Sequence, residues 1–441
     1  MNSRTVTPPA GAASDYVSNF VLQQPLTLSI QPAALASSAT FITVPVSADG
    51  FFNTGSSVQI TATAPPGYVF TGFSGALTGA QNGQTLLMSA AKTVVAHFAP
   101  SPVTYSITGN GKQDLSVYYP GLGGYQYSLL SAGNGTYTSV PTAGIGAFDT
   151  VLQADFNGDA KSDMLFYSTT TGAFKIGLGD GTGHFTYTSS NISPGYNVIA
   201  RGDFNHDGKT DLLLYRQSDG AAYVGLSNGD GTFNFLSQTF SPGFTTVAVA
   251  DYNGDGISDV ILYNNQTPPY VAYYLPGDGT GHFGSGSSLF FGPGYSVYPA
   301  DLNADGKSDF ILYRPADGTV FVAIGNGTSF TYHYLLYSPG FTSFKIGDVN
   351  GDGFPDLVLY NNVNANGYLL LGDGAGNFPT GFSLFFGPGM DFVDLRDFNG
   401  DGKQDVLLYR TADGTSFTGL SNGSGFSYTY NYFGPGRIVA Q

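Results

Sequence analysis

The segment Asp397–Asp405 reads DFNGDGKQD, and segments of this kind occur six times between residue 155 and the C-terminus. The other five copies read DFNGDAKSD, DFNHDGKTD, DYNGDGISD, DLNADGKSD and DVNGDGFPD. They begin at Asp155, Asp203, Asp251, Asp301 and Asp348. Successive copies are therefore 47 to 50 residues apart, and a nearly constant interval of this size indicates one structural unit repeated along the chain.

Each unit is predicted to contain four short strands. An apolar strand such as VAVAD leads into the Asp-rich loop, and a second strand such as DLLLY leaves it. A third strand follows a turn, and a Gly-Asp-Gly or Asn-Gly turn leads to the fourth. Four strands with no room for a helix describe the blade of a β-propeller. A weaker copy at 106–114, SITGNGKQD, adds a seventh unit, so we expect a seven-bladed β-propeller over residues 103–441.

The composition also favours an all-β fold. All 31 acidic residues are Asp, which favours turns over helices. The net charge of -16 argues against nucleic acid as a partner, and the lack of Cys excludes disulfides and thiolate metal sites. No apolar stretch approaches the roughly 18 residues needed to cross a bilayer, so we expect no membrane insertion. Residues 1–11 lack the basic start and apolar stretch of a secretion signal.

The region before the repeats is expected to be organised differently. Residues 1–24 are predicted to be a flexible segment, 25–99 a small β domain and 100–102 a linker. Val103–Ser106 and Arg437–Ala440 both match the first strand of a unit. The sequence does not decide which of these two segments completes the first blade.

The loops have the composition of a calcium site. Side-chain oxygens at positions 1, 3, 5 and 9 and a carbonyl at position 7 suit a hard cation with six to eight oxygen ligands, which favours Ca²⁺ over Mg²⁺ or Zn²⁺. No pattern of Lys or Arg is expected to offset the clustered carboxylates, so we expect about six Ca²⁺ sites. Position 12 is never Glu, which excludes an EF-hand. The alternative is six polar turns without an ion.

The expected metal ligands occupy the same five positions in each loop. They are Asp155, Asn157, Asp159, Lys161 and Asp163; Asp203, Asn205, Asp207, Lys209 and Asp211; Asp251, Asn253, Asp255, Ile257 and Asp259; Asp301, Asn303, Asp305, Lys307 and Asp309; Asp348, Asn350, Asp352, Phe354 and Asp356; and Asp397, Asn399, Asp401, Lys403 and Asp405. Two loops depart from the pattern. Ala160 replaces the Gly at position 6, which should strain that turn. The loop at 106–114 keeps only Asp114 and is expected to bind nothing.

These loops, with a Pro-Gly blade entry between them, resemble the FG-GAP/VCBS repeats of integrin α-subunit heads and many exported bacterial proteins. The resemblance covers about three quarters of the chain. It implies a seven-bladed propeller with Ca²⁺ in its loops, an extracellular or cell-surface setting, and a binding or adhesion role without catalysis. The segment GYVFTGFSG at Gly67–Gly75 is similar to divergent internalin-B-type repeats, with Phe73 where that family usually has Trp. Together the two resemblances imply a modular bacterial surface or secreted protein.

A partner is expected on the face of the propeller opposite the Asp loops. Alternating connections place the second-to-third turns and the blade entries on that face, where Tyr, Phe and Arg recur. Aromatic and Arg side chains suit contacts with a protein or glycan ligand. The candidate partner-binding residues are Arg216, Arg314, Arg410, Tyr196, Phe244, Tyr295 and Phe341. A Tyr four residues after each loop's last Asp is expected instead to pack between blades.

Three functional classes stay open on these grounds. The first is an adhesion or binding module, and the second is a multivalent carbohydrate-binding, lectin-like propeller. The third is an accessory module of a larger secreted enzyme. Catalysis by this chain is not expected, because it lacks Cys and Glu, has no G-x-S-x-G motif, and its five His occur in unrelated settings.

Overall fold

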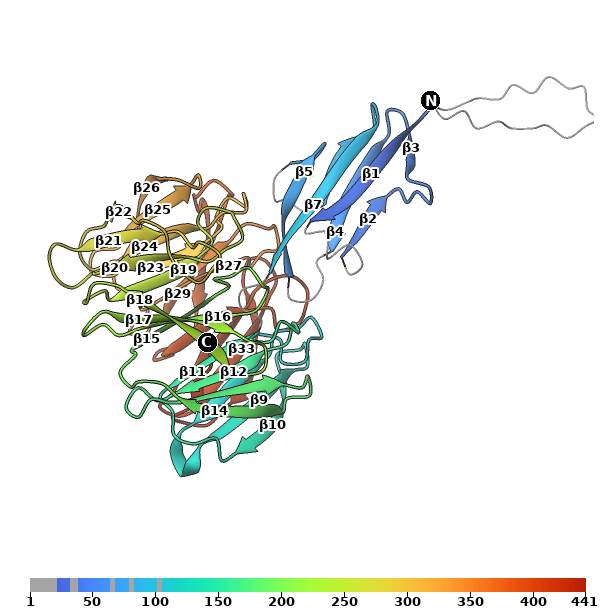
Figure 1. The fold of residues 1–441 in the computed structure, drawn as a ribbon. Helices are drawn as coiled ribbons and strands as arrows, with labels where there is room; N and C mark the ends of the chain where they lie inside the picture. Colours follow the sequence, from blue (N-terminus) through green and yellow to red (C-terminus); the bar gives the residue numbers. More distant parts are fainter. Residues whose placement is uncertain (1–21, 32–38, 64–67, 79–82, 101–104) are drawn as a thin grey trace, which may run out of the picture.

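The computed structural model describes residues 22–31, 39–63, 68–78, 83–100 and 105–441, which form an all-β chain (Figure 1). Within these residues the one helical segment is the 3-10 turn Gly121–Gly123. The described residues contain no helix with the length and hydrophobicity to cross a membrane. The expected flexible segment falls mostly on residues 1–21, outside the described ranges.

The N-terminal β domain consists of two sheets, drawn in blue in Figure 1. Its strands are β1 (Gln23–Gln31), β2 (Thr40–Val44), β3 (Phe51–Asn53), β4 (Ser57–Thr63), β5 (Tyr68–Gly75), β6 (Gln84–Leu87) and β7 (Lys92–Pro100). The sheet orders are β3-β1-β7-β5 and β2-β4-β6. β1 begins at Gln23, within the expected segment 1–24, and β7 ends at Pro100, the first residue of the expected linker. Alternation along β4 buries Val58 and Ile60 in a shared core.

The repeat region forms seven four-stranded antiparallel sheets in its described residues. The first contains β8 (Leu115–Tyr119), β9 (Tyr125–Ser131), β10 (Tyr137–Ala143) and β35 (Ile438–Val439). The second contains β11 (Thr150–Ala154), β12 (Asp163–Tyr167), β13 (Ala173–Gly179) and β14 (Phe185–Asn191). The third contains β15 (Val198–Gly202), β16 (Asp211–Tyr215), β17 (Ala221–Ser227) and β18 (Phe233–Thr239). The fourth contains β19 (Thr246–Ala250), β20 (Asp259–Tyr263), β21 (Val271–Leu275) and β22 (Ser287–Phe290).

The remaining three sheets follow the same strand order. The fifth contains β23 (Ser296–Ala300), β24 (Asp309–Arg314), β25 (Thr319–Gly325) and β26 (Phe330–Leu336). The sixth contains β27 (Ser343–Gly347), β28 (Asp356–Tyr360), β29 (Asn366–Leu371) and β30 (Thr380–Phe385). The seventh contains β31 (Phe392–Arg396), β32 (Asp405–Tyr409), β33 (Thr415–Ser421) and β34 (Phe426–Tyr432). The all-β prediction and the four-stranded unit are confirmed.

The second strand of each unit lies deepest in the fold. In β16 all five residues are buried, because the sheet packs against a neighbouring sheet on both of its faces. This explains why these strands read as continuous apolar runs. The fourth strand, such as β18, is the sheet edge, and its burial falls to half-buried and exposed residues.

The sheets pack in a ring. Core clusters join each sheet to the next along the chain. A further cluster joins Leu115 and Val117 of the first sheet to Leu407 and Tyr409 of the seventh. The last sheet thus packs on the first, which is the arrangement of a propeller.

The C-terminal segment completes the first sheet. Ile438 and Val439 pair with Tyr118 and Val117 of β8. Of the two segments that match a first strand, Arg437–Ala440 therefore supplies it, while residues 103–104 lie outside the described ranges. Figure 1 shows the C-terminus beside β11 and β12, and the Gln153 N–H donates to the Gln441 carbonyl at 2.8 Å.

A buried arginine ties this junction together. Arg396, at the end of β31, has no exposed side-chain surface. Its Nε donates to Asp394 Oδ2 at 3.0 Å, and its Nη1 and Nη2 donate to the carbonyls of Asp114 and Ala440 at 2.8 and 2.7 Å. The guanidinium also lies 3.7 Å from the ring centre of Tyr105. One side chain of the seventh sheet therefore holds both ends of the repeat region.

Candidate metal centres in the Asp loops

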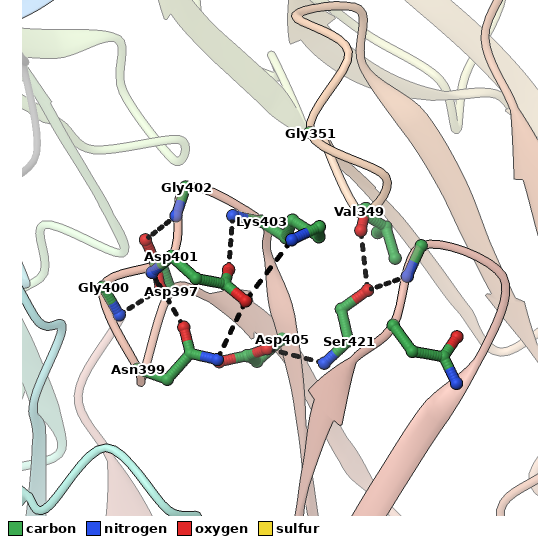
Figure 2. A network of polar contacts seen from close by, with 12 residues as sticks. Val349, Gly351, Asp397, Asn399, Gly400, Asp401, Gly402, Lys403, Asp405 and Ser421 are labelled. Carbon is green, nitrogen blue, oxygen red and sulfur yellow. Dashed lines mark hydrogen bonds and ion pairs between the residues drawn. The ribbon is translucent and has the colours of Figure 1, made fainter.

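Each Asp loop joins the first and second strands of a sheet, as predicted, and the Asp at position 1 organises it. In the loop between β31 and β32, Asp397 Oδ1 accepts the Gly400 N–H at 2.6 Å and Oδ2 accepts the Gly402 N–H at 2.9 Å (Figure 2). Asp155 makes the same bonds to Gly158 and Ala160. The carboxylate thus folds the turn around itself.

The side chains at positions 3 and 5 lie next to each other. Asn399 Oδ1 accepts the Asp401 N–H at 2.9 Å, and Asn399 Nδ2 donates to Asp401 Oδ2 at 3.1 Å (Figure 2). Asp401 Oδ1 in turn accepts the Lys403 N–H at 2.9 Å. Oxygens from positions 1, 3 and 5 are therefore grouped on one short hairpin.

The expectation that no basic residue offsets these carboxylates is wrong for four loops. The Lys at position 7 pairs with the Asp at position 5, with Nζ to Oδ2 distances between 2.7 and 3.5 Å. These pairs are Lys161–Asp159, Lys209–Asp207, Lys307–Asp305 and Lys403–Asp401. Ile257 and Phe354 occupy position 7 in the other two loops, which have no such cation.

The Asp at position 9 has a structural task that the sequence did not reveal. Asp405 is completely buried, and its Oδ2 accepts the Phe398 N–H at 2.9 Å. Its Oδ1 accepts the Ser421 N–H at 2.7 Å (Figure 2). Asp163 bonds in the same way to Phe156 and Gly179. The carboxylate joins the loop to the end of the third strand, and a bond between segments so distant in sequence has no local signal.

A serine at the end of the third strand connects neighbouring sheets, and sequence reasoning missed it. Ser421 Oγ donates to the Val349 carbonyl in the preceding sheet at 2.6 Å (Figure 2). Ser227 and Ser131 do the same for the carbonyls of Phe156 and Phe398, both at 2.5 Å. Ser227 and Ser421 follow Gly-Leu at the end of the third strand, whereas Ser131 follows Leu-Leu, so the sequence carries only a weak signal for this contact.

Burial raises the pKa of the carboxyls at positions 1 and 9. Removal from water raises the pKa of Asp163, Asp211 and Asp309 to about 7. It raises the pKa of Asp259 and Asp405 to about 6, and that of Asp155 and Asp397 above its usual range. A nearby cation would favour the charged carboxylates and offset the free-energy cost of burying their charge.

The loop of the first sheet retains the carboxylate that holds the hairpin but lacks two of the carboxylates expected to bind a metal. It lacks the carboxylates of positions 1 and 5, yet Asp114 is completely buried and its Oδ1 accepts the Ser131 N–H at 2.7 Å. Its Oδ2 accepts from the Thr108 N–H and hydroxyl, both at 3.1 Å. The one Asp that this loop retains is the one that holds the hairpin.

Backbone hydrogen bonds link the loops to one another. The N–H at position 8 of a loop donates to the position 1 carbonyl of the preceding loop, at 2.7 to 2.8 Å. These bonds are Gln113 to Asp397, Ser162 to Ser106, Thr210 to Asp155, Ser258 to Asp203, Ser308 to Asp251 and Gln404 to Asp348. The seventh is missing because Pro355 has no N–H. The loops thus lie side by side around one face of the ring.

The residues of the six loops fit a calcium ion by their chemistry. Each loop offers carboxylate and amide oxygens from positions 1, 3, 5 and 9 of one hairpin, the ligand type that Ca²⁺ prefers. Within the described part of the chain, no three His, Cys, Asp or Glu side chains are gathered as a ready-made metal site. The position 5 carboxylates are turned toward Lys in four loops, and the position 9 carboxylates accept two N–H groups.

The aromatic residues predicted to face a partner are buried. Tyr196, Phe244, Tyr295 and Phe341 are each no more than 6% exposed. Their prediction as partner contacts is therefore corrected, because each ring packs in the core between two sheets. The sequence pattern placed them correctly at the blade entries but could not show that the next sheet covers them.

The tyrosine at the end of each second strand packs between sheets, as expected, and has a polar task as well. Tyr215 is completely buried, and its hydroxyl donates to the Ser241 carbonyl at 2.9 Å and accepts the Phe244 N–H at 3.1 Å. Tyr409 bonds in the same way to Gly434 and Arg437. Each of these hydroxyls fastens one sheet to the entry of the next.

The three arginines on this face are engaged within the chain. Arg216, Arg314 and Arg410 each pair with the Asp three residues later, with Nη2 to Oδ2 distances of 2.7 Å. Arg216 Nη1 also donates to the Pro194 carbonyl, and its guanidinium lies 5.3 Å from the Tyr196 ring centre. These side chains are about 30% exposed, so they hold the turn to the blade entry while offering one edge to solvent.

Comparison with known families fits this loop geometry. The FG-GAP-like repeat model matches residues 155–214, 203–262, 251–312, 301–359 and 348–408, which together span more than half of the chain. The chain belongs to the FG-GAP-like repeat family. Residues 38–102 match the model of the divergent InlB B-repeat domain, in agreement with the expected second resemblance. No curated protein matches the chain.

Several solved structures share the fold of this FG-GAP-like repeat protein. An Agrocybe aegerita lectin that recognises non-reducing terminal N-acetylglucosamine aligns with a TM-score of 0.59 at 17% identity, over 75% of this chain and 96% of the lectin. A Lactobacillus plantarum protein aligns at 0.52 and 11% identity, over 75% and 100%. A proposed 6-phosphogluconolactonase of Bacteroides uniformis aligns at 0.51 and 13% identity, over 74% and 97%. At these identities the likeness concerns the fold alone.

Proposed function

We propose that this chain is a calcium-stabilised, non-catalytic binding module of an extracellular or cell-surface protein. FG-GAP-like and InlB-type repeats are typical of surface or extracellular proteins. The observation that carries the proposal is the sixfold repetition of D-x-N-x-D-x-x-x-D on strand-to-strand hairpins along one face. Extracellular calcium would fill even sites of millimolar affinity.

The proposed role of the ion is to hold the loops in place. A calcium ion would be held by the oxygens of positions 1, 3, 5 and 9 and would neutralise carboxylates that burial makes costly to charge. In four loops it would take the place of the Lys ammonium beside position 5. Six ions would offset 12 of the 16 net negative charges of the chain.

Calorimetric melting in calcium and in chelator tests this proposal. An ion at about 100 times its dissociation constant stabilises the folded form by ~2.7 kcal/mol per site, so the melting temperature should rise by many degrees in calcium. Asp230→Asn is the matched control, because Asp230 caps a hairpin turn outside the loops and should leave the calcium response unchanged. Equal melting temperatures in calcium and in chelator would refute the proposal.

A lectin-like activity is the second candidate function. The solved structure with a TM-score of 0.59 is a lectin, and the present chain exposes tyrosines on its outer strands. Aromatic rings with free hydroxyls suit sugars, which have apolar faces and polar edges. Glycan-array binding that free monosaccharide inhibits would favour this role over protein adhesion.

Absence of catalysis belongs to the same proposal. The histidines that make polar contacts do so with single structural partners, such as Ser74 for His97 and the Gly256 carbonyl for His206, both at 2.7 Å. Neither contact belongs to a hydrogen-bonded series of nucleophile, base and orienting carboxylate. If the parent protein is a secreted enzyme, this chain would serve it as an accessory binding module.

A further inference from the structure

The outermost strands of four consecutive sheets carry exposed large apolar side chains, which we call the aromatic arc. Its members are Phe290 on β22, Tyr332, Tyr334 and Leu336 on β26, Phe385 on β30, and Tyr428, Tyr430 and Tyr432 on β34. Their exposed fractions run from 42% to 94%. In β10, β14 and β18, all described, no large apolar side chain is exposed in this way. The arc therefore occupies one side of the ring. The repeat alone would give every sheet the same outer strand and would not confine these side chains to one side.

Four members of the arc occupy equivalent positions along the outer strands of their sheets. Each pairs with the first residue of the third strand in its own sheet, next to the turn that joins the second and third strands. The pairs are Val271–Phe290, Thr319–Leu336, Asn366–Phe385 and Thr415–Tyr432. The arc thus follows the rim of the face opposite the Asp loops. Exposed apolar side chains gathered in this way mark an interaction surface.

A pocket lies within the arc, between the sixth and seventh sheets. It has a volume of about 370 Å³ and is lined by Phe385, Met390, Phe417, Tyr428, Arg410 and Thr415, among others. Pockets of roughly 300 Å³ and above hold small ligands. Here the rings supply flat apolar walls, while the half-buried Arg410 and Thr415 supply a polar side.

The chemistry of the arc favours a neutral, hydroxyl-rich partner. The strands β22, β26, β30 and β34 contain no Asp, Lys or Arg, in a chain of net charge -16. A charged partner would meet no complementary charge on these strands. Within the described residues, no hydrogen-bond partner reaches the hydroxyls of Tyr334, Tyr430 or Tyr432. The surface therefore offers apolar rings edged by free hydrogen-bonding groups.

Spacing along the strands adds a second argument. Tyr428, Tyr430 and Tyr432 alternate along β34, and two residues of a strand span roughly 6.6 Å. Tyr332 and Tyr334 repeat this step on β26. A row of rings at a constant step suits a ligand that is itself a repeat of flat units with apolar faces.

We propose that the aromatic arc binds a neutral polysaccharide chain, with one sugar ring in the pocket between β30 and β34. This inference rests on the proposed binding function and names its partner class. Sugar rings stack on the exposed aromatic side chains through their C–H faces, and their hydroxyls bond to the tyrosine hydroxyls and to the exposed edge of Arg410.

Affinity electrophoresis with the whole chain in calcium tests the inference. Native gels would contain hydroxyethylcellulose, glucomannan, arabinoxylan, glycogen or laminarin, with polygalacturonate as the charged comparison. At least one neutral polymer should retard the wild-type chain. The double variant Tyr430→Ser/Tyr432→Ser and the variant Phe385→Ser should each weaken that retardation about tenfold.

The controls use the same register on the other side of the ring. Asn191 and Thr239 pair with the first residues of β13 and β17, so Asn191→Ser and Thr239→Ser should bind like the wild type. The replaced arc side chains are exposed, and unchanged melting temperatures would show that the variants fold. Unretarded migration of the wild type in every neutral gel overturns the inference.

Other outcomes separate the inference from the proposed function. Self-association that the arc variants abolish, or a protein ligand that they lose, would assign the arc to protein contacts and overturn the polysaccharide. Retardation by polysaccharide with no effect of calcium on melting would refute the calcium role and leave the arc standing. A rise of the melting temperature in calcium without any polysaccharide binding would support the calcium role and overturn the inference about the arc.

Discussion

At the scale of single residues, the Asp loops hold their hairpins and, in our proposal, also bind an ion, and a sequence motif cannot separate these two tasks. The position 9 carboxylate is completely buried and bonds to two N–H groups, even in the first sheet, where Asp114 is the only acidic residue of its loop. The position 5 carboxylate is partly exposed and touches only its own loop. Position 9 therefore serves the hairpin with or without an ion, while position 5 would serve the proposed ion, in four loops by exchanging its Lys partner for it.

Ala160 offers a direct test of loop strain. It has φ of 64°, in the left-handed region, where the other five loops have Gly. Because a side chain in this region costs roughly 1–2 kcal/mol, Ala160→Gly should raise the free energy of unfolding in urea by about 1 kcal/mol. Gly306→Ala is the control at the same loop position, with φ of 83° and no atom within 4 Å of the added carbon. Gly306→Ala should lower the free energy of unfolding by a similar amount. If both variants are as stable as the wild type, the assignment of strain is contradicted.

At the scale of strands and hairpins, every sheet except the sixth is fastened to its two neighbours by polar contacts at the two ends of its second strand; the sixth lacks one contact because Pro355 has no N–H. At one end the position 8 N–H bonds to the preceding loop, and at the other the Tyr hydroxyl bonds to the next blade entry. Apolar packing fills the space between. The repeat is therefore held by polar contacts at its rims and by burial in its middle.

Tyr215→Phe tests the fastening at the blade entry. The change removes only the hydroxyl and leaves the Phe244 N–H and the Ser241 carbonyl without their partner. The Phe244 N–H is buried, and a buried group without a partner costs about 1–3 kcal/mol, so chemical denaturation should show a loss in this range. Tyr334 is 59% exposed, so the control variant Tyr334→Phe should change the free energy of unfolding by less than about 0.5 kcal/mol. A Tyr215→Phe variant as stable as the wild type would show that the hydroxyl is dispensable.

The strands and the loops were predictable because their signals are local. Continuous apolar runs such as Asp211–Tyr215 indicated buried strands, and Asp at fixed steps indicated the hairpins. The burial of Tyr196 and the task of Asp163 were not predictable, because both depend on a partner segment brought close by folding. The sequence left the closing strand undecided for another reason, since two segments carry the same pattern.

At the scale of the whole molecule, the ring is closed by the C-terminal strand and by one buried cation. Arg396 reaches the carbonyls of Asp114 and Ala440, which lie at opposite ends of the repeat region. Its partner Asp394 is also within 3.6 Å of Lys345. A pairing between residues some 280 positions apart leaves no local trace in a single sequence.

Replacing Arg396 tests this closure. Arg396→Met leaves two carbonyls and the Asp394 carboxylate without their main partner, so the free energy of unfolding should fall by about 3–5 kcal/mol. Lys345→Met is the matched control, because Lys345 is 31% exposed and its pair with Asp394 should be worth less than about 1 kcal/mol. Equal effects of the two changes in urea unfolding would contradict the closing role of Arg396.

The calcium content of the purified chain, measured by elemental mass spectrometry after equilibrium dialysis, tests the central claim most directly. Six Asp loops should hold six ions per chain, and Asp401→Asn, which alters a partly exposed position 5 ligand, should hold five. A wild-type content near zero in excess calcium, or the same content in the wild type and the variant, would contradict the account.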